Sequence, residues 1–307
     1  MSLLLLLEQT LNGVQFGVFL FLISAGLTLV FGIMNMVNLA HGSLYMLGAY
    51  YGATLVGLTG SFLLALVLTI PLALLTGMVL EVIALRTLYQ RDHMDQVLAT
   101  FGLILFFNEF VRLVWGAEAQ SMPLPEMFDG NVEIIPGVPY PVFRLVIIGV
   151  GVLVAIFLYF LISKTRIGML IRAGASNRTM IGALGVNIRF LYTVVFGLGA
   201  ALAAIAGVMA GPILSVEPGM GEEMLILAFV VIVVGGIGSI RGAVVASIIV
   251  GVFETVGRST LPDLLTLIVP VDTAQTAGPA LSSMLIYILM AAVLFFKPEG
   301  LFPARTG

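Results

Sequence analysis

The chain has 307 residues, of which 60% are hydrophobic and 9% are charged. Soluble domains average about 45–50% apolar and about 25% charged residues, so this composition excludes a cytosolic globular enzyme, a nucleic-acid-binding protein and a disordered protein. The net charge is -3, and the absence of cysteine excludes disulfides, thiolate metal sites and cysteine nucleophiles. The composition predicts a polytopic helical membrane protein.

Long apolar stretches predict the membrane helices in chain order, because a crossing helix needs about 20 mostly apolar residues. These stretches lie at 12–33, 39–58, 62–85, 96–115, 142–162, 190–211 and 280–296. The region 224–257 is also apolar but is interrupted by glycines and Arg241, so it forms either two short spans or one broken element. We therefore expect an all-α fold of eight to nine transmembrane helices with glycine-rich broken segments, forming one transmembrane domain over residues 1–307.

The basic residues predict the orientation of the chain, because cytoplasmic segments are enriched in Lys and Arg. With nine crossings and the N-terminus outside, the outer segments keep only Arg112, Arg144 and Arg258. The inner segments then hold Arg86, Arg91, Lys164, Arg166, Arg172, Arg178, Arg189, Arg241, Lys297 and Arg305. The acids Glu118, Glu126, Asp129, Glu133, Glu217, Glu222 and Glu223 fall outside. The C-terminus is expected to be cytoplasmic.

Two loops stand out between the predicted spans. The outer loop 116–141 carries five prolines and is expected to be an ordered segment. The inner loop 163–189 is the most basic, and residues 169–184 predict a short helix lying across the cytoplasmic face. On composition alone, the basic residues of that loop could equally satisfy the positive-inside rule and contact anionic membrane lipid.

The sequence lacks the motifs of the main catalytic classes. The two lysines, Lys164 and Lys297, do not follow the glycine pattern of a P-loop, so any ATP would be hydrolysed by another chain. The two histidines, His41 and His93, stand in different segments and do not form a zinc-protease motif. We expect no enzymatic activity, no metal site and no cofactor in this chain.

Two breaks in the apolar pattern are candidates for a translocation path. The first, at 34–43, contains Asn35, Asn38, His41 and Gly42 without a charge. Uncharged polar groups at membrane depth must be buried in protein or line a cavity. The alternative is a tight cytoplasmic turn in which Asn38 caps the next helix, and for His41 a hydrogen-bonded packing role is favoured over substrate contact.

The second break contains Gly235, Gly236, Gly238 and Ser239. Paired interruptions in the two halves of a transporter point to its path, whereas a plain glycine turn between helices is the alternative. In contrast, Gly199, Ala203, Gly207 and Gly211 recur every four residues and predict a smooth face for helix packing.

The acidic residues near the predicted spans test whether the chain could be a proton-coupled carrier. A proton-coupled carrier usually needs a carboxylate at the middle of the membrane. Glu254 has Arg258 four residues on, Glu109 has Arg112 three residues on, and Glu81 lies close to Arg86. Ion pairs at these positions would weaken the carrier interpretation.

The chain resembles the permease family of branched-chain amino acid ABC transporters, and looks most like the shorter, H-type permease subunit. The resemblance rests on five short signatures in order: 26–50, 99–102, the inner loop, the glycine break 235–243, and 297–302. In the inner loop the resemblance covers residues 165–168, then Arg172, Ala173 and Asn177. It also covers residues 184–187, which begin with Leu184 and Gly185. Ile181 and Gly182 depart from the small residues expected there.

The resemblance implies a permease subunit of an ABC importer in the bacterial inner membrane. Its partners would be a second, homologous permease, two cytoplasmic ATPase subunits that bind ATP and Mg²⁺, and a periplasmic or lipid-anchored solute-binding protein. The inner loop, with Arg172, Ala173, Asn177, Leu184 and Gly185, would couple the ATPases to the membrane helices. The family also includes permeases for urea, short amides and aromatic acids, so the solute stays open. The alternative function is a stand-alone ion-coupled carrier or facilitated channel.

Overall fold

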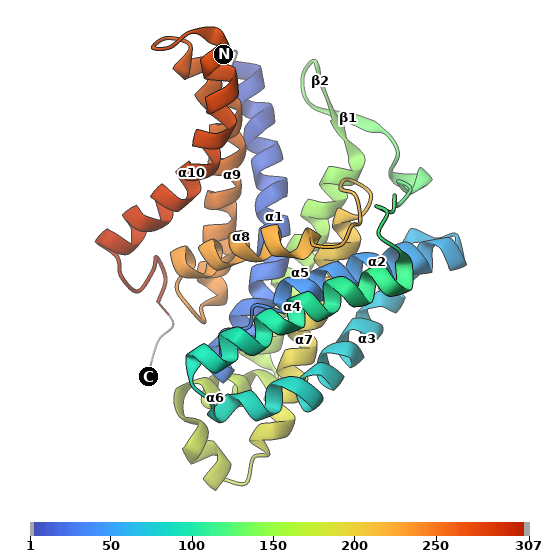
Figure 1. Cartoon of the computed structure of the whole chain (residues 1–307), viewed down its shortest axis with the longest axis vertical. Coiled ribbons are helices and arrows are strands. Elements are labelled where there is room, and N and C mark those ends of the chain that lie inside the picture. Colours follow the sequence, from blue (N-terminus) through green and yellow to red (C-terminus); the bar gives the residue numbers. More distant parts are fainter. Residues whose placement is uncertain (1–2, 304–307) are drawn as a thin grey trace.

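The computed structural model describes residues 3–303, which form a helical assembly with one small β-hairpin (Figure 1). The first half contains α1 (Leu3–Met34), α2 (His41–Thr59), α3 (Phe62–Leu80) and α4 (His93–Trp115). The second half contains α5 (Val142–Lys164), α6 (Arg166–Ala183), α7 (Ile188–Ala210), α8 (Met220–Gly235), α9 (Ile240–Leu265) and α10 (Val271–Phe296). The expected all-α fold class is confirmed.

The number of full-length spans differs from the prediction. Within the described residues, seven helical segments are long and apolar enough to cross a membrane. The expected eight to nine included α2 and α8, which are not among them. The 16 residues of α8 extend only about 24 Å, less than the about 30 Å of a hydrocarbon core. The region 224–257 is therefore one short helix followed by one long helix.

Helix boundaries follow local capping chemistry. Ser61, Thr165, Asn187 and Ser239 stand directly before α3, α6, α7 and α9, and each side chain accepts a hydrogen bond from a backbone N–H in the first turn. These bonds satisfy donors that a helix start leaves without an intrahelical partner. At the other end of α2, Gly60 adopts a φ of +65° and closes the helix.

The predicted span 62–85 ends in a change of helical geometry. After α3, the chain passes through a π-helical turn, η1 (Glu81–Leu85), and a 3₁₀ turn, η2 (Arg86–Gln90). π-helical turns are uncommon and often occur at functional positions. The helical path therefore continues beyond residue 85 before the chain turns into α4.

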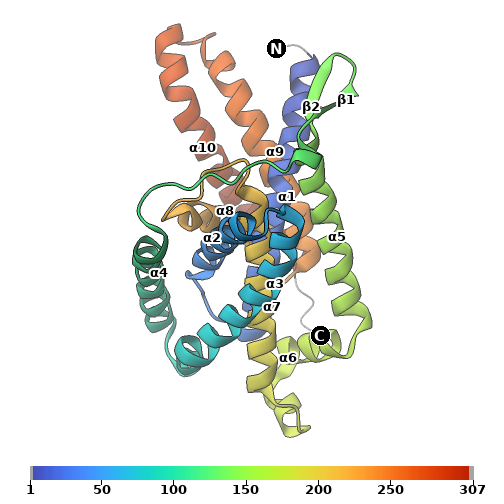
Figure 2. The same ribbon diagram turned by 90° about the vertical axis from the view of Figure 1, so that its right-hand side faces the viewer.

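The core is built around α1 and α7, whose most apolar windows are 83% and 78% buried. Figure 2 shows these two helices in the middle, with α4 and α5 on opposite sides. The small-residue face of α7 packs as predicted. Gly199 lies against Val30 and Gly26 of α1, and Gly207 lies against the backbone of α2 at Tyr45.

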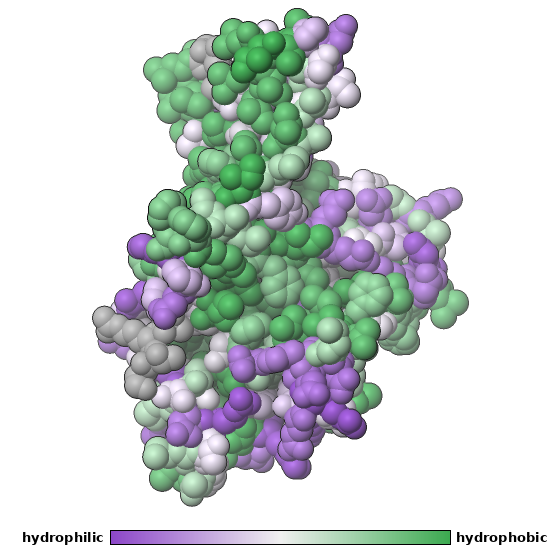
Figure 3. Space-filling view, turned by 60° about the vertical axis from the view of Figure 1, so that its left-hand side comes forward, coloured by the Kyte–Doolittle hydropathy of each residue, from purple (hydrophilic) through white to green (hydrophobic). Residues whose placement is uncertain are grey.

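The outer loop 116–141 is ordered and holds a short 3₁₀ turn, η3 (Glu126–Phe128), and an antiparallel hairpin of β1 (Asn131–Ile135) and β2 (Val138–Pro141). Gln120 also pairs with Val216, which ties this loop to the segment before α8. Hydrophobic residues cover the upper part of the face in Figure 3, at the height of α10 and the start of α1. Such a surface is suited to lipid or to another membrane subunit.

Candidate translocation path and coupling surface

The first break, residues 35–40, divides the predicted polar residues into two environments. Asn35 is exposed, has a φ of +49°, and donates its backbone N–H to the Phe31 carbonyl at 2.9 Å. It is the only non-glycine residue with positive φ in the part of the chain that the structure describes. Asparagine tolerates this left-handed conformation, so Asn35 terminates α1.

Asn38 is fully buried in the turn that precedes α2. Its Oδ1 accepts a hydrogen bond from the Ala40 N–H at 3.1 Å, whereas its Nδ2 has no hydrogen-bond partner within residues 3–303. The alternative that Asn38 caps α2 is wrong, because Ala40 is the N-cap and no side chain caps this helix; the Asn38 side chain instead forms a turn just before it.

His41 opens α2 and is also fully buried. Its Nε2 lies 3.2 Å from the Ile23 carbonyl oxygen of α1. Because a carbonyl oxygen only accepts, Nε2 must carry the proton of this bond. The contact agrees with the packing role that the sequence favoured for His41. Ile23 lies about 16 Å along α1 from its end at Met34, so α2 begins beside the middle of a long membrane helix.

Gly42 brings the beginnings of two helices together. A Cβ at Gly42 would lie 2.9 Å from the Gly221 carbonyl carbon, and a Cβ at Gly221 would lie 2.5 Å from the Gly42 carbonyl carbon. Neither position accepts a larger residue without a shift of the backbone. Just before α8, the Gly219 N–H points to the Met46 sulfur at 3.4 Å. The first turns of α2 and α8 are therefore in direct backbone contact.

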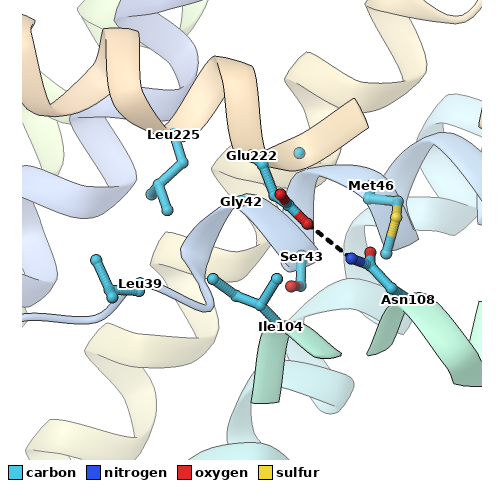
Figure 4. A pocket seen from close by; sticks show the side chains of 9 residues that line it. Leu39, Gly42, Ser43, Met46, Ile104, Asn108, Glu222 and Leu225 are labelled. Atoms are coloured by element: carbon cyan, nitrogen blue, oxygen red, sulfur yellow. Dashed lines mark hydrogen bonds between the residues drawn. The ribbon is translucent and has the colours of Figure 1, made fainter. Parts of the chain in front are cut away.

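A narrow pocket lies beside this contact, between α2, α4 and α8 (Figure 4). In this conformation it is closed, with no room for a water-sized sphere. The polar side chains of the pocket are Ser43, Asn108 and Glu222, and Asn108 donates its amide N–H to the Glu222 carboxylate at 2.7 Å. The remaining lining is formed by Leu39, Gly42, Met46, Ile104, Gly221 and Leu225.

The second break lies at the other end of α8. A Cβ at Gly235 would lie 2.5 Å from the Gly242 carbonyl carbon, so α8 and α9 are in close contact there. Gly236 and Gly238 have φ values of +105° and +79°, which favour glycine. Ser239 accepts a hydrogen bond from the Gly242 N–H at 3.1 Å and begins α9.

The C-terminal signature packs onto this glycine break. The Leu301 N–H donates to the Val234 carbonyl at 2.8 Å, and the Phe302 N–H donates to the Gly235 carbonyl at 3.0 Å. These bonds satisfy carbonyls at the end of α8 that have no partner within the helix. Two sequence signatures that lie far apart in the chain, 235–243 and 297–302, thus form one structural unit.

The eight residues predicted for the path do not form a single site. Gly42 lines the pocket near the start of α8, whereas the glycine break follows the end of the same helix. Asn38 and His41 are buried in the turn before α2, and Asn35 faces α6. A role of these residues in transport stays a prediction.

The residues predicted for coupling lie on α6 and the turn that follows it, at the lower end of the molecule in Figures 1 and 2. Arg172, Asn177, Leu184 and Gly185 are exposed, and Ala173 is half-buried. At Asn177 the helix is kinked, with φ -152° and ψ 90°, and the Asn177 Oδ1 accepts from the Met180 N–H at 2.9 Å. The predicted surface helix of 169–184 is confirmed, with a kink that the sequence did not predict.

A polar hollow of about 360 Å³ separates α6 from the end of α1. Gly32, Ile33 and Asn35 line it from α1 and the residue that follows, and residues 174–179 line it from α6. A residue expected in the path, Asn35, therefore lies opposite a residue expected in the coupling loop, Asn177.

The three acids considered for ion coupling are each paired with arginine. Glu109 contacts Arg112 at 2.8 Å, and Glu254 contacts Arg258. The fully buried Glu81 accepts two hydrogen bonds from Arg86, at 3.3 and 3.0 Å. Tyr89 at 2.8 Å and Thr193 of α7 at 2.6 Å complete its partners, so this network joins α3 to α7.

Sequence reasoning missed Asn108 and its contact with Glu222. The sequence assigned Glu222 to an outer segment, and the structure adds that its carboxylate lies beside α4, one residue after the Gly42 contact. Asn108 is an uncharged polar residue inside the apolar stretch 96–115, which was a usable signal.

Long apolar helices, together with two interrupted segments around a short helix, define a multi-pass membrane protein built like a transporter. A family profile described as "Branched-chain amino acid transport system / permease component" matches residues 9–294. The chain therefore belongs to this permease family, and the expected resemblance is confirmed.

Among the curated relatives is the high-affinity branched-chain amino acid transport system permease protein BraD of Pseudomonas aeruginosa. It is 31% identical over 96% of this chain and 95% of its own length. LivH of Escherichia coli, named for the same kind of transport system, is 32% identical over 83% of this chain and 87% of its own length. The ribose import permease protein RbsC of Escherichia coli is 27% identical over 75% of this chain and 71% of its own length. No solved structure matches the chain.

Proposed function

We propose that the chain is the membrane-spanning permease subunit of an ABC importer for branched-chain amino acids or related small solutes. It forms the path together with a homologous second permease and performs no covalent chemistry. Two cytoplasmic ATPase subunits bind ATP and Mg²⁺, and a periplasmic or lipid-anchored binding protein delivers the solute. The assembly lies in the bacterial inner membrane with the C-terminus of this chain in the cytoplasm.

The observation that carries the proposal is the surface of α6 and the turn behind it. This surface combines exposed Arg172 with exposed apolar side chains: Leu184 in the turn is 77% exposed, and Phe190 in the adjoining first turn of α7 is 67% exposed. A mixed basic and apolar surface at one end of a membrane protein suits a soluble partner. ATP can shift the permease between two states only through contacts that differ between them, and this surface offers such contacts.

The path is proposed to follow the two broken segments, residues 35–42 and 235–239. Broken helices mark the binding and gating regions of many transporters. Pairing of Glu81, Glu109 and Glu254 with arginine argues against the ion-coupled carrier, because each candidate carboxylate has a cationic partner. The names of the relatives BraD and LivH support amino acids as the solute.

Reversal of charge on the coupling surface tests the proposal. We expect Arg172→Glu to abolish ATP-driven uptake while the subunit stays in the membrane at the level of the wild type. The control is Arg91→Glu, which changes an exposed arginine outside α6 by the same charge. Wild-type uptake by Arg172→Glu, or an equal loss in both variants, would contradict the coupling role of α6.

Recovery of the tagged chain from gently solubilised native membranes tests the partners. Mass spectrometry should detect a second permease, ATPase chains and a binding protein. Recovery of the chain alone, while other membrane complexes stay intact, would favour the ion-coupled carrier instead.

A further inference from the structure

We propose that Ser43, Asn108 and Glu222 form a contact site for the charged head of the transported amino acid, where α2 and α8 begin. The proposal rests on the proposed function and names the substrate-contacting residues of this subunit. The permease does not need a tight site, because the binding protein selects the solute. A weak polar contact inside the membrane is sufficient to guide it.

The depth of Glu222 is the first observation. His41 at the start of α2 contacts Ile23 near the middle of α1, and Gly42 contacts Gly221 at the start of α8. Glu222 is the next residue along the chain. A carboxylate at this depth is costly unless it faces a partner or a water-filled passage.

Asn108 of α4 provides the second observation. It lies seven residues before the end of α4, between Phe107 and Glu109, and it is half-buried. Its amide donates to Glu222 at 2.7 Å, but both side chains remain open on one side. A hydrogen-bonded polar pair between two membrane helices points to a passage or to a partner rather than to lipid.

Ser43 provides an independent third observation. Ser43 is only 4% exposed, and its hydroxyl makes no hydrogen bond within residues 3–303. Its oxygen is not among the fully buried unpaired atoms, so it stays accessible at the pocket and has capacity for a ligand. Figure 4 shows Ser43 in the middle of the group, beside the Asn108–Glu222 bond.

The side chains around the pocket carry the groups that an aliphatic amino acid needs, and the pocket must widen between transport states to admit one. The Glu222 carboxylate can accept charge-assisted hydrogen bonds from an α-ammonium group. The Ser43 hydroxyl can donate to the α-carboxylate, and the starts of α2 and α8 both direct positive dipole ends to this region. Met46, Ile104 and Leu225 offer apolar contacts for a branched side chain.

The test uses the importer complex purified from native membranes and reconstituted into lipid vesicles. Uptake of labelled leucine and hydrolysis of ATP are measured in the same vesicles. We expect Glu222→Gln to lower leucine uptake per ATP hydrolysed by about tenfold, as the loss of a hydrogen bond to a charged group does. Ser43→Ala should lower the same ratio, and Glu222→Asp should restore part of it.

Glu223→Gln is the matched control, since Glu223 is exposed in the same first turn but does not line the pocket. Glu223→Gln removes the same favourable interaction of a carboxylate with the helix dipole. The ratio of leucine uptake to ATP hydrolysis should stay within about twofold of the wild type. Equal ratios in Glu222→Gln and Glu223→Gln would overturn the contact site. Leucine uptake by wild-type vesicles without ATP would instead overturn the proposed function, and this control is read before any variant is compared.

Discussion

The contact between Gly42 and Gly221 predicts that one methyl group will separate the two short helices. Ordinary van der Waals contacts begin at 3.4 Å, but a Cβ at Gly42 would lie 2.9 Å from the Gly221 carbonyl carbon and 3.0 Å from the Leu225 Cβ. The crowding atoms belong mainly to backbone and cannot rotate away. Gly42→Ala therefore requires a movement of α2 relative to α8.

The same helix contains a position where the substitution is harmless. A Cβ at Gly57 would meet no atom within 4 Å. Replacement of a helical glycine by alanine gains about 1 kcal/mol of helix stability, and Gly57→Ala should keep this gain. At Gly42 the overpacking cost of about 1–3 kcal/mol opposes it. We expect Gly42→Ala to be less stable than Gly57→Ala by the overpacking cost.

Thermal denaturation of the purified protein in detergent measures this difference. The midpoint of Gly42→Ala should fall below that of the wild type, and the midpoint of Gly57→Ala should equal or exceed it. Because Gly42 and Gly221 share one contact, a second alanine at Gly221 should cost less in the Gly42→Ala background than alone. Equal midpoints for Gly42→Ala and Gly57→Ala would refute the close packing of the two helices.

Three further predictions concern other parts of the fold. Glu81→Gln should destabilise the protein and lower the thermal midpoint. The loss of stability should be smaller than the about 3–5 kcal/mol of a fully buried pair, because Arg86 keeps 34% of its side chain exposed. An unchanged midpoint would contradict the network. Gly236 has a φ of +105°, and a Cβ there would lie 2.7 Å from the Phe302 carbonyl oxygen. Gly236→Ala should therefore loosen the C-terminal segment and speed cleavage after Glu299 by a glutamate-specific protease. Unchanged cleavage would show that the segment stays docked. Asn187→Ala should destabilise the start of α7 by about 0.5–2 kcal/mol, measured as faster hydrogen exchange in its first turn, and equal exchange would exclude the cap.

The long helices could be predicted because the bilayer imposes a length and an apolar composition on every crossing segment. The start of α8 at Met220 could not be predicted in the same way. Glu217, Glu222 and Glu223 gave this segment the composition of an outer loop. The Glu222 carboxylate accepts a hydrogen bond from Asn108, which lies 114 positions earlier in the chain. Sequence patterns do not reveal which helices become neighbours in this way.

The candidate site was predicted in part for a similar reason. Asn35 and Asn38 belong to one polar cluster in the sequence, but a left-handed residue at 35 ends α1 and separates their environments. Gly42 was identified as part of a break, and the structure adds the helix that it contacts. The kink at Asn177 depends on a local side-chain bond that competes with the helix, which composition alone does not specify.

The docking of residues 297–302 on the end of α8 has a consequence for the biogenesis of the protein. The carbonyls of Val234 and Gly235 receive their hydrogen bonds from Leu301 and Phe302. During synthesis, α8 must enter the membrane more than 60 residues before these donors have left the ribosome. The end of α8 therefore stays open to water or to an insertion factor until α9 and α10 are in place, and its closure is a late step of assembly.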